Sequence, residues 1–173
     1  LIFCKIIDNT FGYYGTVGLS HRHIVSLGSS TNLTNLNELK DNRFYYAKGN
    51  ESIRFDSGEG LDIKGNNWEQ NTALPIRLNG IINTNISTNN WFEANTLTDC
   101  EIEINSGAFV IDSTPTSVEG NTFHPYANIV AFVKVNNSLC KLYFDNNSGD
   151  ATGKVICSDT TKVYSEIGNS FSG

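Results

Sequence analysis

The sequence predicts an all-β fold, which we expect to be an antiparallel sandwich, a jelly roll or a small barrel. The chain contains about a dozen short runs of alternating or β-branched residues, separated by Gly, Asn, Ser and Pro. Leucines at helical spacing occur in one stretch only, 32–48, which supports no more than a short turn of helix. The stretch 128–144 has two apolar arms around the polar link Asn136-Asn137-Ser138, which is typical of a β-hairpin.

Strands follow one another through the first half of the chain. Residues 1–7 alternate loosely between polar and apolar side chains, and 19–27 alternate cleanly, so both are expected to be strands. Aromatic residues at 44–46 mark the next strand, and 51–64 contains two short strands around Ser57-Gly58. Further short runs lie around Pro75.

The second half of the chain contains the strands that should form most of the core. They are expected at 99–104, 108–112, 128–135, 139–144, 154–157 and 162–167. In 99–104 the alternation predicts that Cys100, Ile102 and Ile104 face the core, while Asp99, Glu101 and Glu103 form a solvated face. The arm 128–135 is apolar on both faces, which predicts an interior strand with Ile129, Phe132 and Val133 nearly fully buried.

The domain organisation follows from a break at Gly65-Asn66-Asn67. We expect an N-terminal β lobe over 1–66 and a sandwich-like binding domain over 67–173, or a single domain over 1–173. No internal repeat is strong enough to predict a solenoid, although the Asn-rich stretch 79–105 has the character of one or two β-helix rungs. The absence of Met indicates a fragment or a processed product.

Charge and composition exclude several classes of partner. The net charge is -6, and the 12 basic residues are scattered singly, which argues against a nucleic acid or an anionic membrane surface. No apolar run reaches the length of a membrane span. The four cysteines, Cys4, Cys100, Cys140 and Cys157, form no CxxC pair, so buried free thiols are expected rather than zinc ligands or a disulfide framework.

Catalytic motifs are absent from the sequence. The chain has no G-x-S-x-G and no H-E-x-x-H, so no catalytic residue is assigned and an enzyme is not expected. Paired carboxylates could serve a glycosidase, but their spacing in the sequence does not give their separation in space.

Aromatic residues in amide-rich surroundings favour a glycan-binding site. An aromatic ring can stack on a sugar while neighbouring amides bond its hydroxyl groups. The alternative for each tryptophan is a role as a core anchor. The candidate ligand-binding residues are Trp91, Trp68, Phe92, Tyr126 and Tyr45.

One stretch resembles a pattern of bacteriophage tail fibres. Asn35-Leu36-Asn37-Glu38-Leu39, followed by Arg43-Phe44-Tyr45-Tyr46, is similar to a turn and strand in the distal domains of these fibres and of tailspikes. The resemblance implies an intertwined homotrimer at the virion surface that recognises a bacterial surface glycan or protein without chemistry of its own. Two alternatives are a secreted bacterial carbohydrate-binding or adhesin module and a fragment of a tailspike polysaccharide depolymerase.

The pair His21 and His23 is a candidate metal site. In an extended strand both imidazoles lie on the side that carries Leu19, Val25 and Leu27. In a homotrimer, three such pairs around the threefold axis would supply an octahedral site for a transition metal. The alternative is a core histidine that is hydrogen-bonded to a neighbour. No other cofactor is expected.

Overall fold

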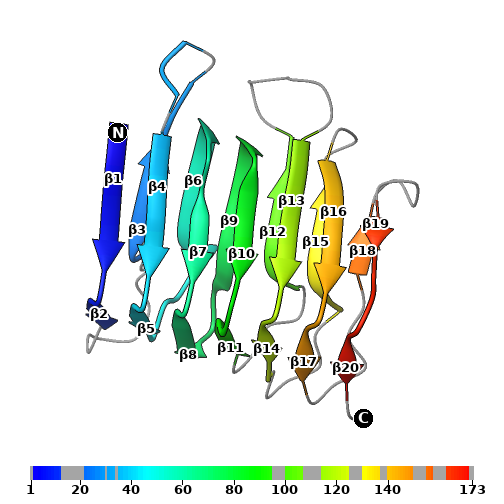
Figure 1. The fold of residues 1–173 in the computed structure, drawn as a ribbon. Helices are drawn as coiled ribbons and strands as arrows, with labels where there is room; N and C mark the ends of the chain where they lie inside the picture. Colours follow the sequence, from blue (N-terminus) through cyan, green and yellow to red (C-terminus); the bar gives the residue numbers. More distant parts are fainter. Residues whose placement is uncertain are drawn as a thin grey trace.

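The fold is a parallel β-solenoid. The computed structural model describes residues 2–12, 22–29, 31–33, 35–94, 100–106, 114–124, 130–136, 140–149, 155–157 and 163–171. Every regular element that these residues form is a strand, and every strand pair is parallel. The chain passes through three sheets in turn and then begins again one strand further along, so that each turn of the chain forms one coil (Figure 1).

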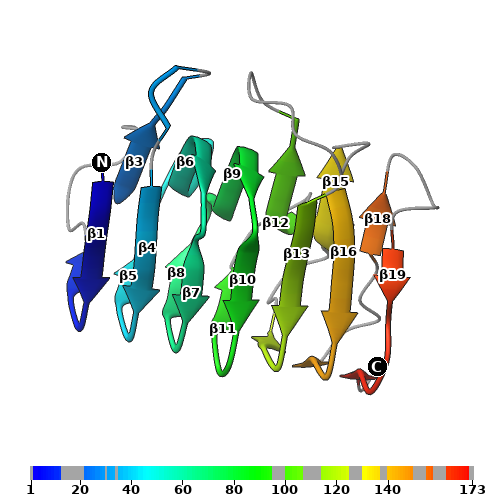
Figure 2. The same cartoon turned by 45° about the horizontal axis from the view of Figure 1, so that its top comes forward.

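The three sheets run the length of the molecule, with the two chain termini at opposite ends (Figure 1). Sheet 1 contains β1 (Ile2–Ile7), β4 (Asn35–Lys40), β7 (Asp62–Lys64), β10 (Thr84–Ser87), β13 (Thr114–Glu119), β16 (Cys140–Asp145) and β19 (Val163–Ser165). Sheet 2 contains β2 (Thr10–Gly12), β5 (Arg43–Tyr45), β8 (Asn67–Asn71), β11 (Trp91–Ala94), β14 (Thr122–Phe123), β17 (Ser148–Gly149) and β20 (Ser170–Phe171). Sheet 3 contains β3 (Ile24–Leu27), β6 (Glu51–Glu59), β9 (Leu74–Ile82), β12 (Cys100–Asn105), β15 (Ala131–Asn136) and β18 (Val155–Cys157). The rotated view shows sheets 1 and 3 as two layers (Figure 2).

The all-β character is confirmed, but the predicted antiparallel sandwich, jelly roll or small barrel is wrong. The two arms of the expected hairpin, β15 and β16, lie in different sheets. Each arm pairs instead with the equivalent strand of the preceding coil, for example Ile102 with Val133. A side-chain period of two is the same in parallel and antiparallel strands, so the pattern could not reveal the direction of pairing. The leucine-rich stretch expected to form a turn of helix contains β4.

The interior position of the first arm is confirmed. The strand β15 lies between β12 and β18, and Phe132 and Val133 are fully buried. Ile129 lies outside the described residues.

A recurring corner leads each coil from sheet 1 into sheet 2. The first residue of this corner has a left-handed backbone, which Asp, Asn and Gly tolerate better than other residues. Its φ is 56° at Asp8, 54° at Asp41, 66° at Gly65, 62° at Asn89, 65° at Gly120, 55° at Asn146 and 71° at Gly168. An asparagine follows in every case, and these seven form the asparagine ladder: Asn9, Asn42, Asn66, Asn90, Asn121, Asn147 and Asn169.

The asparagine ladder satisfies the backbone of the corners inside the solenoid. The backbone N–H of Asn42 donates to Oδ1 of Asn66 at 3.0 Å, and Nδ2 of Asn66 donates to the carbonyl of Leu39 at 2.8 Å. The same two bonds recur at Asn147, whose side chain accepts from Asn121 at 3.0 Å and donates to Val118 at 2.9 Å. Five of the seven ladder residues are at most 1% exposed, and their amides are tolerated there because they are hydrogen-bonded.

An aromatic stack fills the core beneath sheet 2. Its rings occupy the second position after each ladder asparagine, and neighbouring rings are 4.9–5.1 Å apart between Phe11, Phe44, Trp68, Phe92 and Phe123. In the sixth coil this position is Gly149, which has no side chain. Offset stacking at this separation adds to the free energy gained from burying the rings. The stack and the ladder continue across residues 65–67, where the sequence suggested a domain boundary.

Candidate functional site

The outer face of sheet 2 displays one side chain per coil in a straight row. The residue after each ladder asparagine points away from the aromatic stack, and these residues are Cα partners in neighbouring strands. The row, which we call the outer row, consists of Thr10, Arg43, Asn67, Trp91, Thr122, Ser148 and Ser170.

Trp91 is the only tryptophan of the two with an accessible ring. It is 37% exposed, whereas Trp68 is fully buried. Its Nε1 donates to Oε2 of Glu93 at 3.3 Å, and its ring centroid lies 5.4 Å from that of His124. These two contacts fix the orientation of the indole while part of its surface stays open to a ligand.

A polar groove adjoins Trp91 at the corner between sheets 1 and 2. Its volume is about 610 Å³, and its lining comes from the corners of the first four coils, including Asp8, Asp41 and Arg43. The carboxylate of Asp41 lies over Gly65, where a Cβ atom would be 2.3 Å from Oδ1 of Asp41. The absence of a side chain at Gly65 therefore leaves room for the Asp41 carboxylate at this corner.

Two polar groups of the groove have no protein partner among the described residues. The exposed guanidinium of Arg43 forms no ion pair there. Nδ2 of Asn67 donates to Glu69 at 2.5 Å, but its Oδ1 is shielded from solvent and accepts no hydrogen bond. The shielded acceptor of Asn67 is therefore costly, whereas the exposed guanidinium of Arg43 is accessible to a ligand.

The candidate ligand-binding residues occupy different environments. Tyr45 lies on the outer face of sheet 2, half-buried, with its ring 6.4 Å from that of Tyr46. Trp68 and Phe92 belong to the aromatic stack and are fully buried, so their rings are not accessible to a ligand. Tyr126 lies outside the described residues.

His23 faces the interior of the first coils. Its Nδ1 lies 2.8 Å from the hydroxyl of Ser52, and its Nε2 lies 3.1 Å from the backbone oxygen of Tyr45. This arrangement fits a hydrogen-bonded core histidine. His21 lies outside the described residues, so the geometry of the pair is not defined. Among the residues that the structure describes, no group of three or more His, Cys, Asp or Glu side chains is placed to hold a metal ion.

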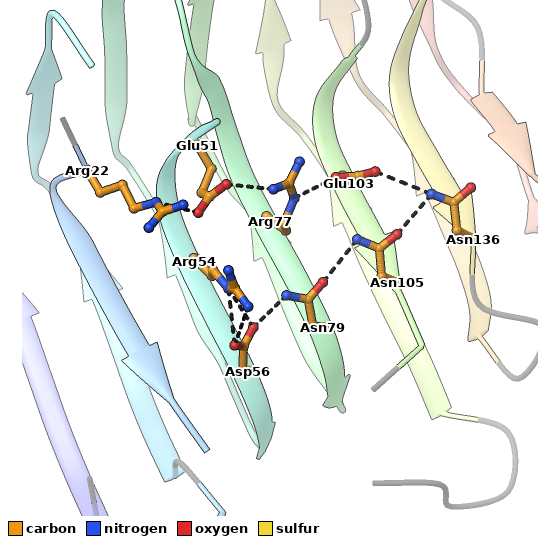
Figure 3. Close-up of polar contacts among 9 residues, drawn as sticks. All are labelled: Arg22, Glu51, Arg54, Asp56, Arg77, Asn79, Glu103, Asn105 and Asn136. Carbon is orange, nitrogen blue, oxygen red and sulfur yellow. Dashed lines mark hydrogen bonds and ion pairs between the residues drawn. The ribbon is translucent and has the colours of Figure 1, made fainter. Parts of the chain in front are cut away.

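The outer face of sheet 3 carries a second polar surface, but its groups are paired with one another (Figure 3). The buried carboxylate of Glu51 lies between Arg22 and Arg77, at 2.6 Å from each, and Arg77 also contacts Glu103 at 2.7 Å. A parallel chain of amides runs from Asp56 through Asn79 and Asn105 to Asn136, as Figure 3 shows. Because these groups satisfy each other, the groove beside Trp91 is the better candidate for a ligand site.

Glu101 departs from the predicted solvated face. It is fully buried in β12, neither of its carboxylate oxygens has a hydrogen-bond partner in the described part of the chain, and burial raises its pKa to about 8. Its neighbours Cys100 and Ile102 are buried as well, so the strict alternation expected of this strand fails there. Cys100 and Cys140 are buried free thiols, as predicted, and Cys4 is also free.

The residues that sequence reasoning missed are Arg43, Asn67 and Glu93. The signal that could have found Arg43 and Asn67 is the corner repeat, in which Asp, Gly or Asn precedes a ladder asparagine, an outward residue and then, in most coils, an aromatic. Sequence and structure comparisons do not add to this picture, because no family model, curated protein or solved structure matches the chain. Within the described ranges, no helix has the length and hydrophobicity needed to cross a membrane.

Proposed function

We propose that the chain is a binding module for a bacterial surface glycan, with the groove beside Trp91 as its site and no chemistry of its own. The observation that carries the proposal is an exposed indole, fixed by Glu93 and His124, at the end of a polar groove. An aromatic face and unpaired polar groups are what a sugar ring requires of a protein surface. Arg43 and Asn67 provide such polar groups.

The experiment compares two aromatic substitutions of equal exposure. Trp91 and Tyr143 are each 37% exposed, but Tyr143 lies on β16 in sheet 1, away from the groove. Trp91→Ala should weaken binding to immobilised lipopolysaccharide and capsular polysaccharide roughly tenfold or more, because the loss of one aromatic stacking contact is worth that factor. Tyr143→Ala should bind like the parent protein. Equal binding by all three proteins would contradict the proposal.

The biological setting that we propose follows the resemblance to phage tail fibres. In that setting the chain acts in host attachment at the virion surface as a homotrimer. Light scattering of the purified protein tests the homotrimer, and a monomer would favour the alternative of a secreted carbohydrate-binding or adhesin module.

A depolymerase fragment is the remaining alternative. Glu69 and Glu93 lie on the neighbouring strands β8 and β11, and Glu93 accepts a hydrogen bond from the indole of Trp91. Release of reducing sugar from a bound polysaccharide, lost in Glu93→Gln, would show hydrolysis and contradict binding without chemistry.

A further inference from the structure

The shape of sheet 2 restricts how a ligand can lie on it. Its strands are short: β8 has five residues and β11 has four, β2 and β5 have three each, and β14, β17 and β20 have two each. A ligand that follows one strand therefore meets no more than three outward side chains. A ligand that crosses the strands meets a new member of the outer row at every coil, about 4.8 Å apart.

The spacing of the outer row suits a linear polymer of small rings. One coil is comparable in length to one sugar unit of an extended glycan, so successive sugars can meet successive residues of the row. From Arg43 the row continues through Asn67 and Trp91 to Thr122, whose hydroxyl lies 3.2 Å from that of Ser148. Guanidinium, amide, indole and hydroxyl groups are all groups that bind sugars.

The charge around the row disfavours anionic sugars. Asp8 and Asp41 line the groove, and Glu69 and Glu93 lie on the same sheet beside Asn67 and Trp91. Among the described residues, the cations at these corners are Arg43, Lys40 and Lys64. Lys40 lies 3.4 Å from Asp41, and Lys64 is paired with Glu38 and Asp62. Carboxylates therefore outnumber cations, and the surface repels uronates and phosphates.

We propose that the ligand is a linear, non-anionic glycan that lies parallel to the solenoid axis across β5, β8, β11 and β14, with one sugar at each coil. This inference rests on the proposed glycan-binding function and adds to it the direction and the charge class of the ligand. In this arrangement Asn67 and Trp91 contact the two central sugars, and Arg43 and Thr122 contact the outer two.

The first part of the test concerns charge. The parent protein is applied to immobilised bacterial polysaccharides of known repeating unit, half of them uncharged or amino-substituted and half rich in uronate or phosphate. The uncharged or amino-substituted members should bind more tightly. Preferential binding of the anionic members overturns the charge class, whereas binding of no polysaccharide at all contradicts the proposed function itself.

The second part concerns direction and uses oligosaccharides of one to six sugars, cut from the tightest binder. Affinity should rise roughly tenfold or more between two and four sugars and then level off. Thr122→Val should remove the gain between three and four sugars, so that four sugars bind no more tightly than three. Ser170→Ala, three coils beyond Trp91, is the matched control and should retain this gain. An affinity that is independent of length, or a gain that survives Thr122→Val, overturns the axial arrangement.

Discussion

Phe132 occupies the place that Gly149 leaves open in the aromatic stack. The Phe132 ring centroid lies 4.6 Å from that of Phe123 and 5.0 Å from that of Phe171, so a side chain from sheet 3 bridges the coil in which sheet 2 has a glycine. Phe132→Ala should therefore cost about 3–5 kcal/mol in the free energy of unfolding. Urea denaturation measures this cost, with Tyr143→Ala as the control that should stay close to the parent. An unchanged midpoint for Phe132→Ala would contradict this packing.

Substitution of Gly149 should destabilise the folded protein nearly as much as substitution of Phe132. A Cβ atom at this position would lie 2.2 Å from the backbone oxygen of Phe123, so even alanine requires the backbone to move. Gly149→Ala should lower the melting temperature clearly. Gly60→Ala is a comparison without a steric clash, because no atom lies within 4 Å of the added Cβ; its only cost is that of alanine at φ +73°, a strain absent at Gly149. A melting temperature for Gly149→Ala at or above that of the parent would show that this close approach does not exist.

The asparagine ladder predicts a large loss of stability when a single buried amide is removed. Asn66→Ala removes the acceptor of the Asn42 N–H and the donor to the Leu39 carbonyl, which lie at 3.0 and 2.8 Å. Each buried group left without a partner costs about 1–3 kcal/mol. Asn85→Ala removes an exposed amide with one bond to Asp62 and should cost much less. Thermal unfolding of the two variants compares them, and equal losses would argue against the ladder.

The buried carboxyl group of Glu101 should make the folded protein less stable as the pH rises. Burial raises its pKa to about 8 in the folded chain from the ordinary value of 4.5, so the folded state retains this proton where the unfolded chain has lost it. The contribution of the protonated group is complete below pH 4.5 and is lost as the pH rises towards 8, at about 1.4 kcal/mol for each pH unit. Chemical denaturation between pH 4.5 and 8 should show this slope in the parent and a shallower one in Glu101→Gln.

Glu119→Gln is the control for the Glu101 experiment, because the Glu119 side chain is exposed. It should retain the slope of the parent protein. The same slope in Glu101→Gln would contradict the assignment of the pH dependence to Glu101.

The strands could be predicted from the sequence, but their arrangement could not. The apolar pattern identified β15 and β16, yet it does not distinguish a hairpin from two strands in different sheets. The corner repeat was obscured by its variable period, because successive ladder asparagines are 33, 24, 24, 31, 26 and 22 residues apart. Only the hydrogen bonds and the stacking in three dimensions show that these positions are equivalent.

The two tryptophans show why the candidate site was predicted only in part. Both follow a ladder asparagine in a similar amide-rich setting: Trp68 is two residues after Asn66, and Trp91 is one residue after Asn90. That difference of one residue places Trp68 in the core and Trp91 on the outer face. Without the position of the ladder, the sequence gives no basis for separating them. The prediction that Glu101 is solvated is wrong for another reason. Strict alternation places Glu101 on the outer face, but β12 buries Glu101 together with its neighbours Cys100 and Ile102.

The glycan site at Trp91 can be tested most directly by following its indole alone. The chain has two tryptophans, and Trp68→Phe retains an aromatic ring in the stack while leaving Trp91 as the only indole. In this variant, iodide should quench the fluorescence of the exposed Trp91 in the free protein. Saturation with a bound surface polysaccharide should protect Trp91 from iodide and shift its emission to shorter wavelength. Polysaccharide binding that leaves both the quenching and the emission of Trp91 unchanged would contradict its place in the site.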